Sequence, residues 1–485
     1  MHSGNSAPTN RSGWVRPSRV FVTVAAGVVM SNLDAFVVNV ALPRIGLEFN
    51  QASLGPVSWI LNAYAVVFAA LLVPAGKTAD RVGARRVYLA GIAIFTASSL
   101  ACSVAPGVWW LVGFRVSQAA GAALLIPSSV GLLLIAAPPE KRMLYIRGWT
   151  ALSATGAALG PALGGLLTEA SWRWVFLINV PIGAAALAAG PALLPRSSAQ
   201  DRSARIDAFG AALLSVGVGA LALGLVESPD WGWESGGVIG SFCMAAVVLT
   251  IFVARSAHHP SPVLPLPLLR VPGFASSSLC NLLFAIPFAA MLLSIVLWAQ
   301  QVWHWSPLVT GFAIAPGPLM VPAFALFIGP LLMKHFGPPI VSLIGCVIFA
   351  AGVLSWIVGM GTTPAYLQLL PGMLITGVGV GLTLPTLIAT AVRALPPGSF
   401  STGSSVVTMA RQVGSVVGVA ALVAILDVGT RAQHSPAAFQ HGWWFTAAVA
   451  LIAAVACSTI GLTSIGSIPR KSARMAKSSA PPPAT

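Results

Sequence analysis

Charged residues are scarce in this chain of 485 residues. Asp, Glu, Lys and Arg together make up 8% of it, whereas about 25% is usual in a soluble globular domain. Hydrophobic residues make up 56%, and they gather in apolar runs of roughly 20 residues, the length that crosses a bilayer as a helix. The sequence therefore excludes a soluble globule and predicts an all-α membrane protein, a polytopic bundle rather than a domain with an anchor.

Groups for catalysis or metal binding are also few. The 11 acids and 7 histidines form no constellation of Ser, His and acid at the membrane surface, and they show no metal-ligand spacing. The cysteines fall inside apolar runs without a CxxC pair, so they are expected to be packing residues that form no disulfide. We therefore expect no enzyme, no cofactor and no metal. The cysteines are Cys102, Cys243, Cys280, Cys346 and Cys457.

The net charge of +15 comes from basic residues spread through short loops. No basic helix or aromatic-basic module stands out, so nucleic-acid binding is not expected. With the amino terminus placed inside, all but five of the 26 lysines and arginines fall in predicted cytoplasmic segments, as the positive-inside rule requires. Both termini are therefore predicted to be cytoplasmic, and the first apolar run, which lacks a cleavage site, is expected to remain as a helix. The exceptions are Arg44, Arg173 and Arg431 outside and Arg115 and Arg411 within helices.

Fourteen membrane-spanning helices are predicted. Twelve of them form two six-helix bundles, and the other two are inserted between the bundles. The predicted division is 1–194 for the first bundle, 195–255 for a linker and the inserted helices, 256–465 for the second bundle and 466–485 for a disordered cytoplasmic tail. The predicted spans are 20–42, 56–75, 87–105, 108–137, 148–168, 175–194, 207–226, 236–254, 274–298, 308–333, 340–360, 365–392, 404–426 and 443–465.

Tryptophan pairs fall at the predicted outer ends of these helices. Such positions are typical of an interfacial belt. An added or lost helix would move half of the pairs to the other side. They are Trp109/Trp110, Trp172/Trp174, Trp231/Trp233, Trp303/Trp305 and Trp443/Trp444.

An internal repeat relates the two predicted bundles at an offset of 258 residues. It indicates two related halves with a transport pathway at their interface. The repeat is asymmetric, because Arg115 corresponds to Met373 and Pro161 to Val419. The matched positions are Gly121, Pro127, Pro138, Pro139, Gly156 and Gly160 with Gly379, Pro385, Pro396, Pro397, Gly414 and Gly418.

The most specific pattern lies in the fifth predicted helix. Glycines recur every four residues there, and a proline interrupts the helical hydrogen bonds, so another helix can approach closely. An ordinary packing face of small residues would have the same spacing. The full wording, GxxxGPxxGG followed by SWRWVFLINVPIG, resembles the helix 5 antiporter motif of drug exporters in the major facilitator superfamily. Its residues are Gly156, Gly160, Pro161, Gly164 and Gly165.

A basic loop, GKTADRVGARR, is predicted from Gly76 to Arg86. It resembles the cytoplasmic signature GxLaDRxGRR of the same superfamily, with Thr78 and Ala84 as departures. The resemblance implies a loop that latches the two bundles on the cytoplasmic side; a solvated loop that only sets topology is the alternative. ATP binding is excluded because the preceding residues form an apolar helix. The matched residues are Gly76, Asp80, Arg81, Gly83 and Arg85.

Asp34 is the only acid well inside a predicted span. A carboxylate there costs several kcal/mol, so it is expected to face a cavity and a partner. At about 1.5 Å per residue, Asp34 and Arg115 lie at similar depth in the outer third of a bilayer core of about 30 Å, so the two could pair.

Two further motifs surround this pair. The pattern LxxxRxxQ at Leu111, Arg115 and Gln118 resembles the helix 4 motif of proton-coupled members of the superfamily, and LDAFVVNVALP, with Asp34 and Asn39, resembles helix 1 of fourteen-helix drug exporters. The resemblance implies that Asp34 exchanges a proton under the influence of Arg115. A purely structural buried ion pair is the alternative.

Other residues carry weaker signals. Asp207 is expected to cap a helix, and Asp427 to lie at the outer interface. Arg411, in MARQVGSVVG, resembles the family's opening of helix 13. With Asn39 and Gln118 it is a candidate for lining the cavity; a lipid or phosphate contact is the alternative for Arg411. The prolines of one second-half helix predict either a hinge that lines the cavity or a simple kink. They are Pro316, Pro318 and Pro322.

The resemblance covers essentially the whole chain and identifies it as a member of the fourteen-helix drug:proton antiporter branch. It implies efflux of an amphipathic drug or antibiotic in exchange for protons across the cell membrane. A dedicated exporter of one endogenous metabolite is the first alternative, and a polytopic enzyme or receptor without transport is the second. The expected partners are a small amphipathic substrate, protons and membrane lipid, and the expected state is a monomer. The few charges of the second half favour an apolar or cationic substrate.

Overall fold

The computed structural model describes residues 17–50, 54–138, 141–195, 207–271, 273–395, 400–426 and 436–458. Within these ranges the chain is helical and has no strand. Asp427, Arg431, the matched prolines 139, 396 and 397 and the predicted tail 466–485 lie outside the described residues.

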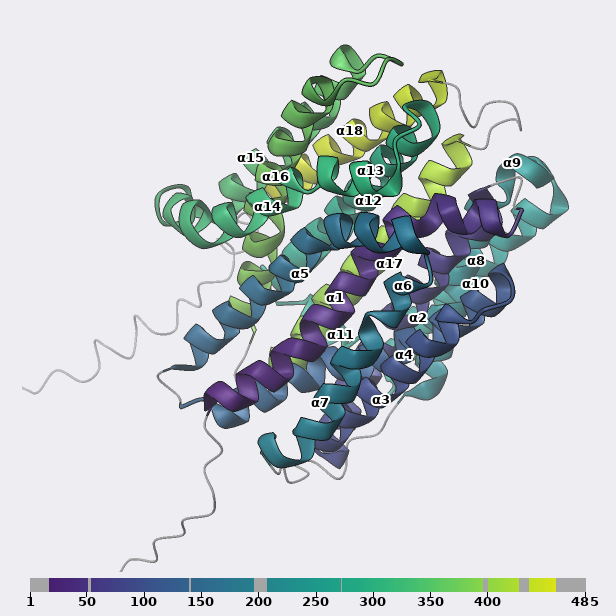
Figure 1. Cartoon of the computed structure of the whole chain (residues 1–485). Helices are drawn as coiled ribbons and strands as arrows, with labels where there is room; N and C mark the ends of the chain where they lie inside the picture. Colours follow the sequence, from purple (N-terminus) through teal and green to yellow (C-terminus); the bar gives the residue numbers. More distant parts are fainter. Residues whose placement is uncertain are drawn as a thin grey trace, which may run out of the picture.

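The helices fall into three groups along the chain (Figure 1). The first group comprises α1 Pro17–Glu48, α2 Leu54–Val82, α3 Ala84–Ser103, α4 Val108–Ala136, α5 Arg142–Ala170, α6 Trp174–Leu177 and α7 Asn179–Leu193. The inserted group comprises α8 Ala208–Val226, α9 Ser228–Trp231 and α10 Gly236–His258. The second group comprises α11 Leu266–Leu269, α12 Phe274–Leu297, η2 Trp298–Val302, α13 Pro307–Ile314, α14 Pro316–Ala323, η3 Phe324–Ile328, α15 Gly329–Gly359, α16 Tyr366–Arg393, α17 Phe400–Leu426 and α18 Pro436–Ser458.

The described helices account for fourteen membrane crossings. Twelve helical stretches are long and apolar enough to cross a membrane. One of them, Pro307–Gly359, has 53 residues and turns at Gly337, whose φ of 76° and ψ of 163° are not helical, so it crosses twice. The 29-residue helix α5 is long enough to make a further crossing. Helices are the form expected here because a bilayer core offers no water to backbone groups.

Small residues let the helices approach closely in both groups. A Cβ at Gly121 of α4 would lie 2.9 Å from the carbonyl oxygen of Gly91 in α3, and a Cβ at Gly379 of α16 would lie 2.6 Å from that of Gly345 in α15. The close α3–α4 contact in the first group therefore has a counterpart in the α15–α16 contact of the second. Such backbone contact gives helix association in a bilayer, where the hydrophobic effect offers little.

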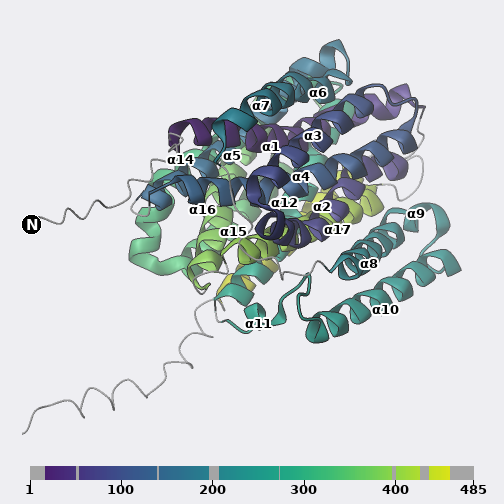
Figure 2. The same ribbon diagram turned by 90° about the horizontal axis from the view of Figure 1, so that it is seen from below.

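Two seams join the first and second groups. At one seam α2 packs against α17, and at the other α5 packs against α13 and α14. The inserted helix α8 packs against both α2 and α17, with α10 outside it (Figure 2). The inserted pair thus covers the α2–α17 seam and leaves the α5–α13 seam uncovered.

Asp207 anchors the inserted pair. Its side chain accepts a hydrogen bond of 2.8 Å from the Gly210 backbone N–H, which caps α8 as predicted. The same carboxylate pairs with Arg255 near the end of α10, with Nη2 2.9 Å from Oδ1, and with His259 at 3.9 Å. One acid therefore holds the ends of α8 and α10 together.

The prediction of a loop from Gly76 to Arg86 is largely wrong. α2 continues to Val82 and α3 begins at Ala84, so Gly83 alone makes the turn. Its φ of 104° and ψ of 129° lie in a region of backbone conformation that residues with a Cβ rarely adopt. Helix formation extends through the basic residues because Lys and Arg are good helix formers.

The predicted tryptophan belt is only partly correct. Trp109, Trp110 and Trp233 are exposed, as expected of residues facing lipid, whereas Trp303 and Trp443 are buried. The buried rings pack inside the second group, where Trp298 lies 4.9 Å from Trp443 between ring centroids. Hydrophobic burial within the protein competes with the interface for these residues.

Other predicted helices also differ from the structure, and the one predicted over 175–194 is divided into α6 and α7. The helix predicted from residue 443 begins at Pro436. The helix predicted over 308–333 is divided, because Pro316 opens α14 and the π-helix η3 follows Pro322. A π-helix within a helix removes regular hydrogen bonds and often lies at a functional site.

Candidate functional site

A polar cluster is buried among the helices of the first group around Asp34. The Asp34 carboxylate is fully buried, and the Arg115 guanidinium is 1% exposed. Arg115 Nη1 lies 2.5 Å from Asp34 Oδ2. Asp34 Oδ1 accepts from Gln118 Nε2 and from Asn179 Nδ2, each at 3.0 Å. Side chains from α1, α4 and α7 therefore meet at one carboxylate.

A second layer of contacts holds the donors in place. Ser99 Oγ on α3 accepts from Gln118 Nε2 at 2.7 Å and from Asn179 Nδ2 at 3.3 Å. Arg115 donates to Gln118 Oε1 at 2.6 Å and through Nε to the Ile60 carbonyl of α2 at 3.2 Å. Burial of an ion pair is compensated only by such additional hydrogen bonds.

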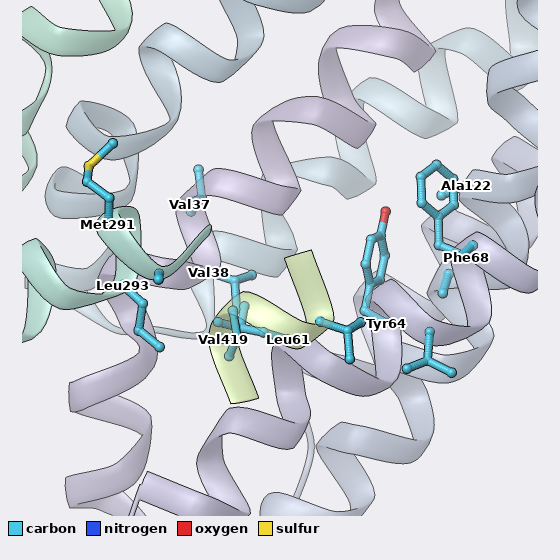
Figure 3. Close-up of a cluster of buried hydrophobic side chains, with 14 of the residues drawn as sticks. Val37, Val38, Leu61, Tyr64, Phe68, Ala122, Met291, Leu293 and Val419 are labelled. Atoms are coloured by element: carbon cyan, nitrogen blue, oxygen red, sulfur yellow. The ribbon is translucent and has the colours of Figure 1, made fainter. Parts of the chain in front are cut away.

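Aromatic rings enclose the charged pair. The Arg115 guanidinium lies 4.0 Å from the centroid of the Tyr64 ring and 6.0 Å from that of Phe176. Figure 3 shows Tyr64 between Phe68 and the apolar side chains around Leu61. The rings contribute cation–π attraction and keep water from the pair.

The arrangement suits an ionised carboxylate. Both carboxylate oxygens of Asp34 accept hydrogen bonds, and none of the described contacts has Asp34 as a donor. A carboxylate accepts only, whereas a carboxylic acid also donates one proton. Protonation would thus disturb the contacts of α1 with both α4 and α7.

The predicted pairing of Asp34 with Arg115 is present, and Gln118 lies within the same network. Sequence analysis missed Asn179, Ser99 and Tyr64. The amide of Asn179 stands in the apolar run WVFLINVPIG, and a polar side chain within a span is a usable signal. Ser99 gives no such signal, since serine is common in membrane helices.

The other two cavity candidates lie apart from this network. Asn39 donates to the Ala35 carbonyl of its own helix at 2.9 Å and is half-buried. Arg411 lies on α17, half-buried, and its carbonyl accepts from Ser415 Oγ at 3.1 Å. Their role as cavity residues stays a prediction.

The residues of the predicted latch lie at the junction of α2 and α3. Arg85 donates from Nη2 to the Pro191 carbonyl of α7 at 2.5 Å, and the neighbouring Lys77 donates to the Pro262 carbonyl before α11 at 2.7 Å. Arg81 is exposed and Gly76 is buried within α2. The side chain of Asp80 lies outside the described part of the structure. The role of these residues as a latch stays a prediction.

The α5 motif packs against neighbouring helices on two of its faces. Its first face packs on α1: a Cβ at Gly156 would lie 3.2 Å from the Val29 carbonyl oxygen, one at Gly164 would lie 3.0 Å from that of Val37, and one at Gly160 would meet Phe36 Cβ. These contacts stay within the first group, so they account for the close approach expected of the motif.

Its second face crosses the seam to α13. A Cβ at Gly165 would overlap the Pro307 carbonyl oxygen, and a Cβ at Gly311 would overlap that of Pro161. Leu308 N–H also lies 3.4 Å from Glu169 Oε2. The backbones of the two groups therefore touch at this seam.

Further contacts between the groups lie at the same end of the bundle, which is predicted to face outward. Gln300 Nε2 of η2 donates to the Val40 carbonyl of α1 at 3.1 Å. Buried apolar side chains of α1, α2, α12 and α17 also meet there (Figure 3). The examples labelled in the figure are Val37, Val38, Leu61, Met291, Leu293 and Val419.

The five cysteines are free, and four of them are buried packing residues as expected. Cys346 and Cys457 approach to 4.0 Å between sulfurs, and both are buried. Cys243 is exposed on α10. Among the described residues no group of three His, Cys, Asp or Glu is placed to hold a metal ion.

Solved structures with the same architecture are peptide transporters. The crystal structure of peptide transporter POT in complex with sulfate superimposes with a TM-score of 0.68, at 16% identity, over 92% of this chain and 95% of that chain. The in meso crystal structure of the POT family transporter PepTSo gives a TM-score of 0.66 at 16% identity, over 94% of this chain and 98% of that chain. These likenesses concern the fold alone.

Sequence relatives are resistance and export proteins. The methylenomycin A resistance protein of Streptomyces coelicolor is 32% identical, over 88% of this chain and 88% of that protein. The tetracenomycin C resistance and export protein of Streptomyces glaucescens is 33% identical, over 83% and 77%. The multidrug resistance protein Stp of Mycobacterium tuberculosis is 32% identical, over 86% and 77%.

Residues 24–419 match the family described as the Major Facilitator Superfamily. With its membrane-crossing helices and exporter relatives, the protein is a multi-pass transporter of the cell membrane rather than an enzyme. By the extent of this match, the chain belongs to the major facilitator superfamily.

Proposed function

We propose that this protein exports an amphipathic drug or antibiotic in exchange for protons by alternating access. The observation that carries the proposal is the fully buried Asp34 carboxylate paired with Arg115. An intramembrane acid with a charged partner is a functional residue by default, since its burial is costly. The names of the relatives support export of antibiotics as the direction of transport.

Asp34 is the proposed proton carrier and Arg115 its partner. Proton uptake neutralises Asp34 and weakens its hold on α4 and α7. Helix α1 also carries Val40, less than two turns further on, whose carbonyl binds Gln300 of the second group. Rearrangement around Asp34 is therefore transmitted along α1 to the contact between the groups.

The α5–α13 seam is the proposed gate at the outer end, formed by the motif glycines. The junction around Gly83, with Asp80 and Arg81, is the proposed latch at the cytoplasmic end. Asn39, Gln118 and Arg411 are proposed to line the pathway when the groups separate. Both termini would then be cytoplasmic, with the rocking bodies being residues 1–194 and 256–465.

A proton gradient supplies enough energy for this exchange. Each entering proton provides about 2.3 kcal/mol per 100 mV of membrane potential and about 1.4 kcal/mol per pH unit. A tenfold substrate gradient costs a similar 1.4 kcal/mol or so. One proton per substrate therefore supports accumulation against a concentration gradient.

Transport by Asp34→Asn in proteoliposomes tests the coupling. Asparagine keeps the size but cannot exchange a proton, so we expect loss of efflux driven by a pH gradient, with drug binding retained. Arg173→Lys, in an exposed pair with Glu48, serves as the matched control. Undiminished proton-driven efflux by Asp34→Asn would overturn the proposal.

A dedicated exporter of one endogenous compound is the second candidate. Two relatives carry the names of single antibiotics, methylenomycin A and tetracenomycin C, whereas Stp is named a multidrug resistance protein. Resistance profiles of expressing cells across unrelated compounds separate the two: a broad profile supports the drug exporter, and protection against one compound supports the dedicated exporter.

A further inference from the structure

Asn179 is the polar residue of the cluster with an unused atom. It opens α7 directly after the turn residue Ile178 and is fully buried. Its Nδ2 donates to Asp34 Oδ1 at 3.0 Å and lies 3.3 Å from Ser99 Oγ. Its Oδ1 is buried and has no hydrogen-bond partner among the described residues. A buried amide oxygen without a partner is costly and calls for an explanation.

The orientation of this amide follows from the charge of Asp34. With the carboxylate ionised, an amide oxygen turned toward it would face an acceptor, whereas the amide N–H₂ gives a hydrogen bond. The observed placement of Nδ2 therefore matches ionised Asp34. In this orientation Asn179 Oδ1 points away from Asp34 and has no donor within reach among the described residues.

A protonated Asp34 needs the opposite partner. Its carboxylic acid must donate one hydrogen bond. Gln118 Oε1 already accepts from Arg115 Nη1 at 2.6 Å, and Arg115 has no acceptor atom. Rotation of the Asn179 carboxamide about its Cβ–Cγ bond would exchange Nδ2 and Oδ1, and this would turn an acceptor toward Asp34.

We propose that Asn179 is a positioning residue that serves both charge states of Asp34: its amide donates to the carboxylate and, after rotation, accepts the proton of the carboxylic acid. The inference rests on the proposed proton coupling and adds a residue to it. The proton comes from water and returns to water; only the amide rotates. Asn179 is the first residue of α7. A change in the charge of Asp34 would therefore change a contact at the start of α7.

The groups around Asp34 leave this role to Asn179. The charged or titratable neighbours are Arg115 on α4, Tyr64 on α2 and Cys102 on α3. Tyr64 presents its ring to the guanidinium, and a thiol is a weak acceptor. The cluster has two amides that can both donate and accept, and the acceptor of Gln118 is already used by Arg115, whereas that of Asn179 has no partner among the described residues.

The pH dependence of efflux in proteoliposomes tests the proposal. Asn179→Ala removes one of the donors that favour the carboxylate over the carboxylic acid, so the half-maximal pH of efflux should rise by about one unit. Asn179→Asp places a second acid beside Asp34, and the half-maximal pH should rise further. Asn179→Ser keeps a small donor and acceptor, so its half-maximal pH should lie between those of the wild type and Asn179→Ala.

Asn281→Ala is the matched control. Asn281 is a buried amide of α12 whose Nδ2 donates to the Val407 carbonyl at 2.9 Å and whose Oδ1 has no partner among the described residues. Its loss should reduce folded protein or rate without moving the half-maximal pH. A merely structural Asn179 would behave in the same way.

The outcomes separate this inference from the proposed function. Loss of coupling in Asp34→Asn, together with an unchanged half-maximal pH in the Asn179 variants, would overturn the role of Asn179 and leave the proton carrier in place. Full proton-driven efflux by Asp34→Asn would overturn both. The order Asp above Ala above Ser above wild type in half-maximal pH supports the amide role.

Discussion

Gly311 of α13 lies against the carbonyl group of Pro161 of α5, so closely that a Cβ on Gly311 would overlap the carbonyl oxygen. The same Cβ would lie 3.0 Å from the Cα of Gly165. The contact joins backbone to backbone across the seam between the two groups of helices. No side chain can yield to make room, so this seam tolerates only glycine at the crossing point.

Gly311→Ala is expected to keep the seam from closing. An added methyl in a packed contact costs about 1–3 kcal/mol. This cost destabilises only the conformation in which α5 and α13 touch. Labelling of single cysteines near the predicted outer end should therefore increase, and efflux should fall. Gly113→Ala is the control, since a Cβ there meets nothing within 4 Å. Equal labelling of Gly311→Ala and wild type would contradict the predicted gate.

Arg115→Lys is expected to reduce proton-driven efflux by about tenfold, because at least one charge-assisted hydrogen bond is lost. Lysine keeps the charge but lacks the planar group that reaches Asp34, Gln118 and the Ile60 carbonyl together. Initial rates in proteoliposomes measure the effect. In the exposed Arg173–Glu48 pair the same exchange should change little. Wild-type rates for Arg115→Lys would show that charge alone suffices.

Gly83→Ala is expected to destabilise the junction of α2 and α3 by about 1–3 kcal/mol, because its φ of 104° and ψ of 129° are unfavourable for a residue with a Cβ. The unfolding temperature in detergent should fall accordingly. Gly107 is the matched control: it precedes α4 in extended conformation, with a φ of −171°, and has nothing near its Cβ position. If both variants unfold at the same temperature, backbone conformation does not limit this turn.

Acidification is expected to loosen the inserted helices at Asp207. Burial alone would raise its pKa, but the hydrogen bonds from the Gly210 N–H and Arg255, with the nearby charge of His259, outweigh burial and hold the pKa of Asp207 below its ordinary value. A carboxyl with a lowered pKa stabilises the fold above its unfolded pKa. That contribution is lost as the pH falls through its folded pKa.

Two variants separate the charge from the cap at this site. Asp207→Asn keeps the cap on α8 and loses the charge, whereas Asp207→Ala loses both, with an additional cost of about 1 kcal/mol. Below about pH 4 the unfolding temperature of the wild type should approach that of Asp207→Asn. A constant difference between the two at every pH would exclude the carboxylate as the source.

The apolar runs predicted a polytopic bundle of membrane-crossing helices, because a bilayer core leaves the backbone no alternative to the helix. The internal repeat and the motifs, not the apolar runs, predicted two related bundles. The depth of Asp34 and Arg115 along their helices predicted their pairing. The spacing of the α5 glycines predicted a close helix contact. These features are local, and each follows from composition or helical period.

Tertiary structure decided which partners these features meet. Glycine spacing along α5 does not tell that three glycines face α1 while Gly165 faces α13, because both faces have the same composition. Nor does a serine at position 99 or an asparagine at position 179 predict that both turn toward Asp34, since that depends on how α3 and α7 are rotated about their axes. Rotation and register arise from side-chain packing between distant segments, which no single stretch of sequence contains.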